Sequence, residues 1–526
     1  MNRQNFYTAI LAASTLLTAV PFATSRAQDK LWVRYDNRFQ ANRSVNIAGA
    51  DSIVATTTQL KIYMPGDKVT TQALTADKMT VQFTDPGRYL LKPDTYSGTN
   101  YESKSAKTGY NFAHSMESEH FALFWDVRYG SNPARIQYPG DGNVASASEV
   151  LKIAERCWDV YVNDLGFLVP GQSTTDKYKI QLYIPYQKDW RADASGTSGV
   201  SGGMTGIGHF NPWAAVARGG HTVAHEVGHT FQFLVSADLG TDAAWHYDAG
   251  WRWGWGGGND NGWWESCADW QAYQIFPERQ FTDGEYFEQH LDKHYLNLLH
   301  DDWRYACCYI HDWWAMKRGR SFIGRMWRET KPYEDPIQTY IRMNKLTQQQ
   351  FCDELMEGYM RMATWDIDGV RERAKHRIGQ HKNYLKAENA AQRIYTTQPA
   401  TCIQNYGYHI TNMQRPAAGT TVKAHFQGLT DAKGYHYVYP ARAGWRYAFV
   451  ALSGDGTRTY GEVKADREGT AELTVPTGCT RLFFVAMGAP TQHWPHPWTS
   501  GKASSEWPQN EEQWPYRVQF EETRPL

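Results

Sequence analysis

The segment HTVAHEVGHTFQ constrains this chain more than any other, because it places His225, Glu226 and His229 in the order H-E-x-x-H. Residues four positions apart lie on the same face of an α-helix, so both imidazoles can bind one metal ion while Glu226 lies beside them. The spacing therefore predicts a helix with two metal ligands and a carboxylate that can reach a water molecule there. The alternative is an ordinary amphipathic helix that carries two histidines.

A catalytic zinc ion takes three ligands from the protein and leaves a fourth position open for water, so a third ligand is needed. His221 precedes His225 by four residues, but three histidines at this spacing climb about 12 Å along a helix that rises about 1.5 Å per residue. One ion with bonds of about 2 Å cannot reach all three. We therefore expect His221 to be an N-terminal helix residue or a substrate contact.

Glu265, in the segment GWWESCADWQAY, is the better candidate for the third ligand. The Ala, Trp and Tyr residues around it suit a second buried helix. Asp269 lies four residues after Glu265, hence on the same face, where its carboxylate could accept the outer N–H of a ligating histidine. Gln232 and Val235 stand where the metzincin pattern continues with Gly and His, which excludes that class.

The pattern H-E-x-x-H followed by E-x-x-x-D on a later helix resembles the gluzincin metallopeptidases, and W-x-E-S-x-A-D is similar to their collagenase and aminopeptidase branches. The resemblance covers about residues 180–375. It implies that His225, His229 and Glu265 bind Zn²⁺, that Glu226 is the general base and that Asp269 orients a ligating histidine. The whole chain is also similar to a family of secreted bacterial proteins, a resemblance that supplies no substrate.

An enzyme of this type also needs a hydrogen-bond donor for the oxyanion of the transition state. In related enzymes a Tyr or His from the helical half supplies this donor, and the segment RYACCYIHDWW contains three such residues. Tyr305, Tyr309 and His311 are therefore candidates, and we predict Tyr309 and His311 as catalytic residues. His246 and His294 are the alternatives in the neighbourhood.

Charge, targeting signals and cysteine content limit the partners and the location that we expect for this protein. The formal net charge of -1 and the pI near 7.0 favour neither nucleic acid nor an anionic membrane as a partner. Residues 1–27 are typical of a signal peptide without a lipoprotein cysteine, and no later run of about 18 apolar residues could span a membrane. We therefore expect a secreted, periplasmic or cell-surface protein without a transmembrane segment. Its 7 scattered cysteines do not form a disulfide scaffold.

The hydrophobic pattern predicts an α+β fold in three parts after the signal peptide. Strand-like alternation in residues 28–113 indicates an N-terminal β module. Residues 114–385 combine strands and helices, as expected of a gluzincin-like metallopeptidase core with a mixed-sheet half and a helical half. Short strands separated by turns in residues 390–526 indicate a C-terminal β-sandwich. Helical spacing within the central part predicts helices over 147–164, 287–300, 303–317, 322–329, 336–343 and 347–364.

Three further segments are candidate substrate contacts. Gly202 to Phe210 is predicted as an edge strand that binds a substrate backbone by strand addition, with a surface loop as the alternative. The Trp- and Gly-rich stretch from Trp245 to Trp264 is predicted as an irregular loop that could form a substrate wall. The C-terminal residues Trp494, Trp498, Trp507 and Trp514 could contact glycans, with core packing as the alternative.

These features predict a secreted zinc peptidase that hydrolyses proteins or glycoproteins with Glu226 as general base. The alternative is a non-catalytic secreted protein that binds glycans or proteins through a metallopeptidase-like core, although the intact Glu226 argues against it. A glycoside hydrolase is a third class, but no catalytic pair can be singled out among 55 acidic residues. The sequence leaves endopeptidase, aminopeptidase and collagen-type protease activity open.

Overall fold

The computed structural model describes most of the chain, which folds as two compact units. One unit comprises residues 1–94 with 177–179, and the other comprises 95–176 with 180–526. The described ranges are 29–35, 38–55, 58–73, 79–82, 89–91, 101–173, 177–196, 205–238, 262–282, 284–331, 334–494 and 512–526. The predicted signal peptide, residues 202–204, most of the Trp245 to Trp264 loop with His246, and Trp498 and Trp507 lie outside these ranges.

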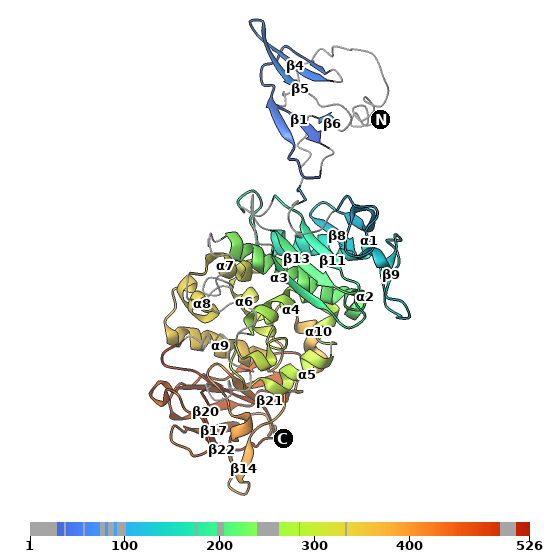
Figure 1. The fold of residues 1–526 in the computed structure, drawn as a ribbon. Coiled ribbons are helices and arrows are strands. Elements are labelled where there is room, and N and C mark those ends of the chain that lie inside the picture. Colours follow the sequence, from blue (N-terminus) through green and yellow to red (C-terminus); the bar gives the residue numbers. More distant parts are fainter. Residues whose placement is uncertain are drawn as a thin grey trace. The chain divides into compact units, whose positions relative to one another are not determined.

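The described part of the N-terminal unit contains two antiparallel three-stranded sheets, ordered β2-β1-β6 and β3-β4-β5 (Figure 1). Leu60 and Ile62 of β4 are buried while their neighbours are more exposed, because successive side chains of a strand point to opposite faces. The unit ends at Asp94, earlier than the predicted boundary at 113. Its strands are β1 (Lys30–Tyr35), β2 (Arg43–Asn46), β3 (Ser52–Ala55), β4 (Gln59–Met64), β5 (Lys68–Ala73) and β6 (Met79–Gln82).

The second unit begins with a five-stranded mixed sheet of order β12-β13-β11-β8-β7. Its strands are β7 (Ser115–Glu117), β8 (Phe121–Trp125), β11 (Ile180–Ile184), β12 (Ala192–Gly196) and β13 (Gly206–Phe210). The parallel strands β8, β11 and β13 are buried at every residue, as strands with both faces covered are. A short hairpin of β9 (Ile136–Gln137) and β10 (Val144–Ala145) stands apart from this sheet.

The sheet order corrects the prediction that Gly202 to Phe210 contains the edge strand. Strand β13 is hydrogen-bonded to β11 on one side and to β12 on the other, so its backbone groups are already used. The described edge strand next to β13 is instead β12, which runs antiparallel to it, and β7 is the strand at the opposite end of the sheet order. Local sequence favoured a strand at Gly206 to Phe210, but strand order depends on long-range pairing.

Helices cover the sheet and continue beyond it, and in Figure 1 α5 and α9 lie between the mixed sheet and the C-terminal strands, whereas α7 lies beside the sheet. The predicted helix over 147–164 is α1, continued by a π-helical segment at Asp159–Asp164. The predicted helix over 287–300 ends earlier, at Lys293, and in the turns that follow the Asn297 and His300 side chains accept hydrogen bonds from nearby backbone N–H groups. The helices are α1 (Ala147–Trp158), α2 (Pro212–Val216), α3 (His221–Asp238), α4 (Trp263–Ile275), α5 (Gly284–Lys293), α6 (Tyr309–Arg318), α7 (Phe322–Glu329), α8 (Pro336–Asn344), α9 (Gln348–Met362) and α10 (Arg371–Ala374).

The C-terminal strands form two sheets, ordered β14-β15-β22-β17-β20 and β16-β21-β18-β19, that share one core as a sandwich. Phe426 of the first sheet stacks on Tyr447 of the second with ring centroids 4.0 Å apart. Trp514 is fully buried and Trp494 packs against the core, so both are packing residues. The strands are β14 (Lys386–Asn389), β15 (Ile394–Thr396), β16 (Tyr408–Met413), β17 (Thr421–Gly428), β18 (Trp445–Ser453), β19 (Arg458–Tyr460), β20 (Glu468–Thr474), β21 (Cys479–Gly488) and β22 (Tyr516–Glu521).

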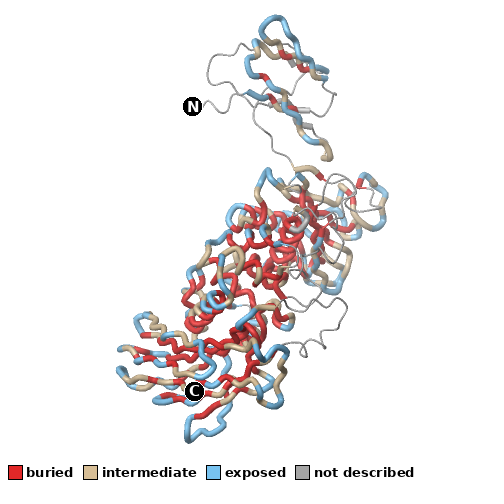
Figure 2. The backbone as a smooth tube through the Cα atoms, turned by 90° about the vertical axis from the view of Figure 1, so that its left-hand side faces the viewer, coloured by how far each residue is buried: buried red, intermediate tan, exposed pale blue. Residues whose placement is uncertain are grey.

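The sandwich packs directly on the helices, which explains why both belong to one compact unit. Buried residues continue from the helical layer into the sandwich (Figure 2). The hydroxyl of Tyr359 on α9 donates a hydrogen bond to the Tyr406 carbonyl oxygen at 2.7 Å, and Arg446 of β18 pairs with Asp353 of α9 at 2.7 Å. Helices and several sheets together confirm the predicted α+β class. Among the described residues, no helix has the length and apolar character needed to cross a membrane.

Candidate metal centre

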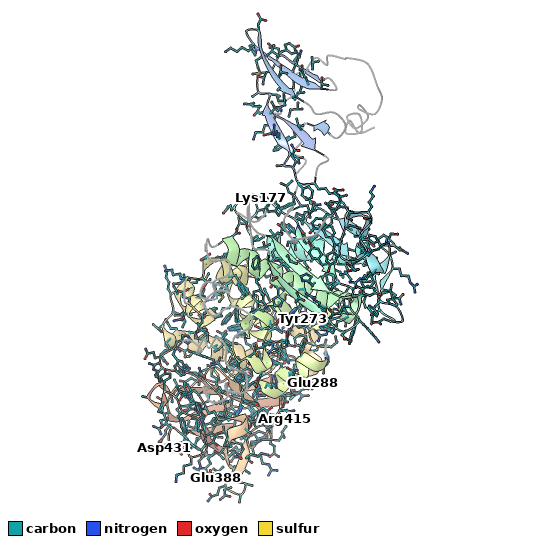
Figure 3. The ribbon with its side chains drawn as sticks, in the orientation of Figure 1. Lys177, Tyr273, Glu288, Glu388, Arg415 and Asp431 are labelled. Carbon is teal, nitrogen blue, oxygen red and sulfur yellow. The ribbon has the colours of Figure 1, made fainter. Side chains whose placement is uncertain are left out.

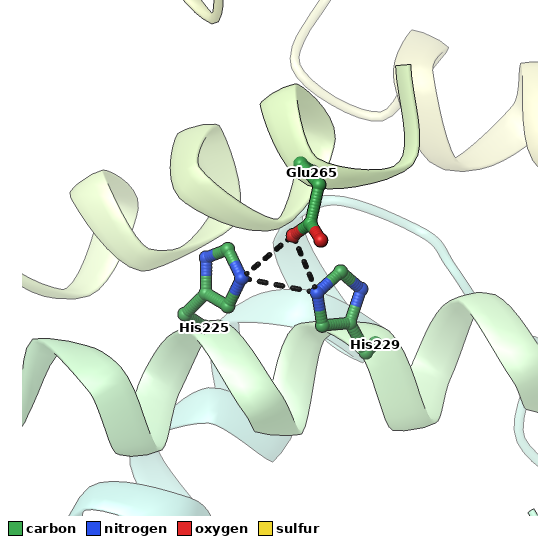
Figure 4. A group of neighbouring side chains, drawn as sticks. All are labelled: His225, His229 and Glu265. Atoms are coloured by element: carbon green, nitrogen blue, oxygen red, sulfur yellow. Dashed lines mark hydrogen bonds and ion pairs between the residues drawn. The ribbon is translucent and has the colours of Figure 1, made fainter. Parts of the chain in front are cut away.

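Helices α3 and α4 cross closely at Gly228, which lies between the two histidines of the H-E-x-x-H segment. A Cβ atom at this position would lie 3.1 Å from Gln271 Oε1 and 3.5 Å from Ala268 Cα. A larger side chain would therefore push the helices apart. Their close approach brings Glu265, in the first turn of α4, over His225 and His229 of α3 (Figure 4).

Three donor atoms converge at this crossing. Nε2 of His225 lies 3.0 Å from Nε2 of His229, and Oε2 of Glu265 lies 3.1 Å and 3.0 Å from these two nitrogen atoms. Ligands about 2.0 Å from a tetrahedral zinc ion lie about 3.3 Å from one another, so these separations suit a common ion. Within the described residues, these three form the one group of His, Cys, Asp and Glu side chains with the spacing to hold a metal ion.

The outer nitrogen atom of each histidine faces an acceptor, which sets the tautomer. Asp269 Oδ1 lies 2.8 Å from His225 Nδ1, and Gln232 Oε1 lies 3.0 Å from His229 Nδ1. The amide nitrogen of Gln232 donates to the Trp264 carbonyl oxygen and to Gln271 Oε1, so its oxygen faces the imidazole. Both Nδ1 atoms therefore carry the proton, and both Nε2 atoms present lone pairs to each other.

Lone pairs of two imidazoles and a carboxylate repel one another at these distances unless positive charge lies between them. Burial disfavours charge on His225, yet Asp269 and Glu265 raise its pKa well above the ordinary value. Burial likewise opposes ionisation of Glu265, yet His229 and His225 hold the pKa of this carboxyl well below its usual range. The group thus attracts a cation, and its donor set fits a divalent metal ion.

Glu226 follows His225 on α3 and is 5% exposed. Its Oε2 atom is buried and has no hydrogen-bond partner among the described residues. Burial raises the pKa of Glu226 to about 7, and the charges of His225 and His229 partly oppose this increase. A buried carboxylate oxygen without a partner is costly, so its presence beside the three donor atoms calls for a ligand or a catalytic role.

Tyr305 is the phenol that contacts the group. Its hydroxyl donates a hydrogen bond to Glu265 Oε1 at 3.2 Å, leaving Oε2 of the same carboxylate toward the histidines. The Tyr305 ring stacks on Tyr286 with centroids 5.1 Å apart, and the guanidinium of Arg218 lies 4.2 Å from the centroid of the Tyr286 ring. These aromatic and cationic contacts hold the phenol in place.

The structure gives Tyr309 and His311, the two predicted catalytic residues of α6, other contacts. The Tyr309 hydroxyl donates to the Gln280 carbonyl oxygen at 2.8 Å. His311 contacts the Cys308 carbonyl oxygen through Nδ1, and its ring packs against Trp263 and Trp270. Both side chains are buried in the core, and neither forms a hydrogen bond with the three donor residues.

The structure also describes two of the three other candidate histidines, His294 and His221. His294 is fully buried and bonds to the Leu291 carbonyl oxygen, away from the three donor atoms. His221 is the first residue of α3, as expected, and its ring lies 4.8 Å from that of Tyr273, which Figure 3 labels inside the second unit. Its position one turn before His225 keeps it out of the donor group.

Sequence reasoning missed two residues that orient His229. Gln232 accepts from the imidazole, and Trp264 stacks on the ring with centroids 4.5 Å apart and planes 13° apart. The signal for Gln232 was present, because a residue three positions after His229 lies on the same helical face and its amide oxygen is an acceptor. Trp264 could not be placed, because its contact depends on how α4 crosses α3.

The fold and the site together define an α+β protein with a buried two-histidine, one-glutamate group that could hold a metal ion. The chain belongs to the family of unknown function DUF6055, which it matches over residues 83–526. The match includes the mixed sheet, the candidate metal centre and the sandwich, and it begins just after β6. Among curated proteins, none matches this chain.

Proposed function

We propose that this protein is a secreted zinc-dependent peptidase of the gluzincin type. The observation that carries the proposal is the position of three converging donor atoms beside Glu226, which lies on the same helix as His225 and His229 and whose buried Oε2 has no hydrogen-bond partner among the described residues. Two imidazoles and one carboxylate are the ligand set of thermolysin-like zinc enzymes, and such sites keep a position open for water. The predicted signal peptide supports an extracellular or periplasmic location.

Each residue has a defined task in this proposal. His225, His229 and Glu265 would hold Zn²⁺, which when bound would activate water and polarise the scissile carbonyl group. Glu226 would accept the proton of the attacking water and pass it to the leaving amine. The Tyr305 hydroxyl, which already lies 3.2 Å from Glu265 Oε1, is the donor best placed to stabilise an oxyanion.

Strand β12 is the candidate platform for the substrate backbone. No described strand pairs with its outer edge, and Asp193 and Ser195 on it are exposed. An extended peptide could add to this edge through backbone hydrogen bonds, which are independent of side-chain identity. The substrate class supported by this arrangement is a protein or glycoprotein segment in extended conformation.

The proposal is tested by metal analysis and peptide hydrolysis on the full-length protein. Glu265→Ala and His229→Ala should lose most of their bound zinc, because each removes a ligand. Glu226→Gln should retain zinc and lose hydrolysis of a peptide and glycopeptide library by about 100-fold or more. Glu278→Gln, a change of the same type at an exposed residue, is the matched control and should retain both properties.

Three outcomes would contradict specific parts of the proposal. Full zinc content in Glu265→Ala would exclude Glu265 as a ligand, and normal hydrolysis by Glu226→Gln would exclude it as the base. Absence of cleavage of every peptide by the zinc-loaded wild type, together with glycan binding that survives Glu226→Gln, would instead support a non-catalytic binding protein.

A further inference from the structure

Two tryptophan side chains are exposed side by side on the second unit. Trp190 is 45% exposed and Trp213 is 44% exposed, and their rings meet edge to face with centroids 5.4 Å apart. Trp190 lies in the loop before β12, and Trp213 lies in the first turn of α2. Single exposed hydrophobic residues are ordinary, but two large indoles held against each other in water are not explained by core packing.

A buried asparagine fixes the two segments that carry these indoles. Asn211 is 1% exposed, and its side-chain amide donates hydrogen bonds to the carbonyl oxygens of Gln187, Lys188 and Asp189 at 3.3, 3.1 and 2.9 Å. Its side-chain oxygen accepts from the Ala214 N–H at 3.0 Å and caps α2. The loop and the helix are thus tied together, so the Trp pair is preorganised and little conformational entropy would be lost when a ligand binds.

The polar residues around Trp190 define the kind of ligand that fits. Lys188 and Asp189 are exposed beside it, and Arg191 pairs with Asp193 at 2.8 Å just beyond. Two cationic and two anionic side chains balance, so the surface favours neither an anionic nor a cationic ligand. It offers flat aromatic faces next to hydrogen-bond donors and acceptors, which suits a neutral, hydroxyl-rich ring.

We propose that Trp190 and Trp213 form a carbohydrate subsite that binds a neutral sugar ring carried by a glycoprotein substrate. The apolar face of a pyranose ring would stack on an indole, while its hydroxyl groups bond to Lys188 and Asp189. A protein partner would require a contiguous apolar patch of roughly several hundred Å², whereas charged residues flank these indoles.

The position of the pair connects it to the proposed active site. Trp190 precedes the edge strand β12 by one residue, Arg191, so a peptide lying along β12 would reach the Trp pair where that strand begins. A glycan attached near the scissile bond would then be bound at the same time as the backbone. This inference rests on the proposed function, because it takes the ligand to be part of the peptidase substrate.

The test measures binding in the full-length Glu226→Gln protein, which removes turnover from the experiment. Calorimetry would compare a neutral O-glycosylated peptide with the same peptide without its sugar, after a glycan array selects the sugar. The double variant Trp190→Ala/Trp213→Ala should lose affinity for the glycopeptide by about 10-fold or more, and each single variant by about 3-fold or more. Affinity for the unglycosylated peptide should remain unchanged.

Tyr439→Ala is the matched control, because Tyr439 is an aromatic residue of similar exposure, 41%, on the C-terminal sandwich. It should leave glycopeptide affinity unchanged. An unchanged affinity in the double Trp variant would overturn the subsite, as would an equal loss for both peptides, which would assign the indoles to an apolar side chain of the substrate. Loss of binding in Tyr439→Ala alone would place the glycan on the sandwich instead.

Failure of the subsite and failure of the peptidase proposal remain distinguishable. Glycopeptide binding is read in a variant without the general base, so it does not require catalysis. If the protein binds the sugar through the Trp pair but cleaves no peptide, the subsite would be supported and the proposed activity contradicted. If the protein cleaves glycosylated and unglycosylated peptides equally well, with and without the Trp pair, the proposed activity would be supported and the subsite contradicted.

Discussion

Gln232 Oε1 lies 3.0 Å from His229 Nδ1, in the same relation that Asp269 Oδ1 has to His225 at 2.8 Å. The two candidate histidine ligands therefore differ in the group that accepts the hydrogen bond from Nδ1. This group is a neutral amide for His229 and a carboxylate for His225. A carboxylate makes the imidazole more basic than an amide does, whereas both partners fix the tautomer and the ring orientation. The two partners thus separate the effect of orientation from the effect of charge.

Gln232→Ala should lower zinc affinity by about 10- to 100-fold, because the His229 ring loses its acceptor while all three ligands remain. Asp269→Asn should also weaken binding, since it removes the negative charge but leaves an acceptor. Competition with a chromophoric chelator measures both, and saturating zinc should still fill each site. Gln274→Ala is the control, because the side-chain amide of Gln274 donates to the Trp270 carbonyl oxygen within α4. Equal affinity in wild type and Gln232→Ala would show that His229 needs no such partner.

Gly228→Val should destabilise the protein and weaken metal binding together. The new side chain would meet Gln271 Oε1 and the Ala268 backbone and would force α3 and α4 apart, at a cost of about 1–3 kcal/mol. Thermal unfolding and chelator competition test this. Gly284→Val is the control, because no atom of the described residues beyond the chain neighbours lies within 4 Å of a Cβ at that exposed helix terminus. A Gly228→Val protein with unchanged melting temperature and zinc affinity would contradict the tight crossing.

Asp366 connects the helices to the sandwich, so its replacement should make stability less dependent on pH. Burial opposes its ionisation, but hydrogen bonds from Tyr460 and Arg371 hold the pKa of this carboxyl below the ordinary value of 3.8. A carboxyl whose pKa is lowered by folding stabilises the folded state. This stabilisation is complete at pH values above the ordinary pKa, and it is lost as the pH falls through the folded-state pKa. Asp366→Asn should therefore unfold about 1–3 kcal/mol more easily at pH 7, with a difference that shrinks below about pH 4.

Thermal melts between pH 7 and pH 3.5 measure this difference. Asp368→Asn is the control, because Asp368 also pairs with Arg371 but its side chain is 68% exposed, and exposed pairs contribute little. A difference between wild type and Asp366→Asn that stays constant down to pH 3.5 would contradict a pKa lowered by folding, because the loss should begin where the unfolded-state carboxyl is protonated. A difference of zero at pH 7 would remove Asp366 from the stabilising contacts.

All 7 cysteines are free and buried, so the folded protein should not react with Ellman's reagent. Burial also raises the pKa of the Cys267 thiol to about 12, which keeps the reactive thiolate scarce. Seven thiols should react after denaturation without reductant, and dithiothreitol should leave the melting temperature unchanged. Fewer than 7 reactive thiols in the denatured protein would reveal a disulfide, which contradicts the structure.

Regular elements were predicted well where the signal is local. The helices predicted over 322–329 and 336–343 correspond to α7 and α8 within one residue, because the apolar periodicity that marks each helix lies within its segment. Strand order was not predictable in this way. Gly206 to Phe210 is a strand as expected, but its place inside the sheet follows from pairing with Ala192–Gly196 and Ile180–Ile184, which no local pattern specifies.

The sequence by itself determined the donor set of the candidate metal centre. His225 and His229 lie on one helical face because the α-helix repeats about every 3.6 residues. Glu265 lies on the next helix, and the gluzincin resemblance implies that it is the third ligand. Only the tertiary structure decided what surrounds these donors. Tyr305 rather than Tyr309 contacts Glu265, and Gln232 orients His229, because both contacts depend on the angle and separation at which separate helices pack. Helical periodicity acts over a few residues, whereas these contacts are set by side-chain packing across the whole core.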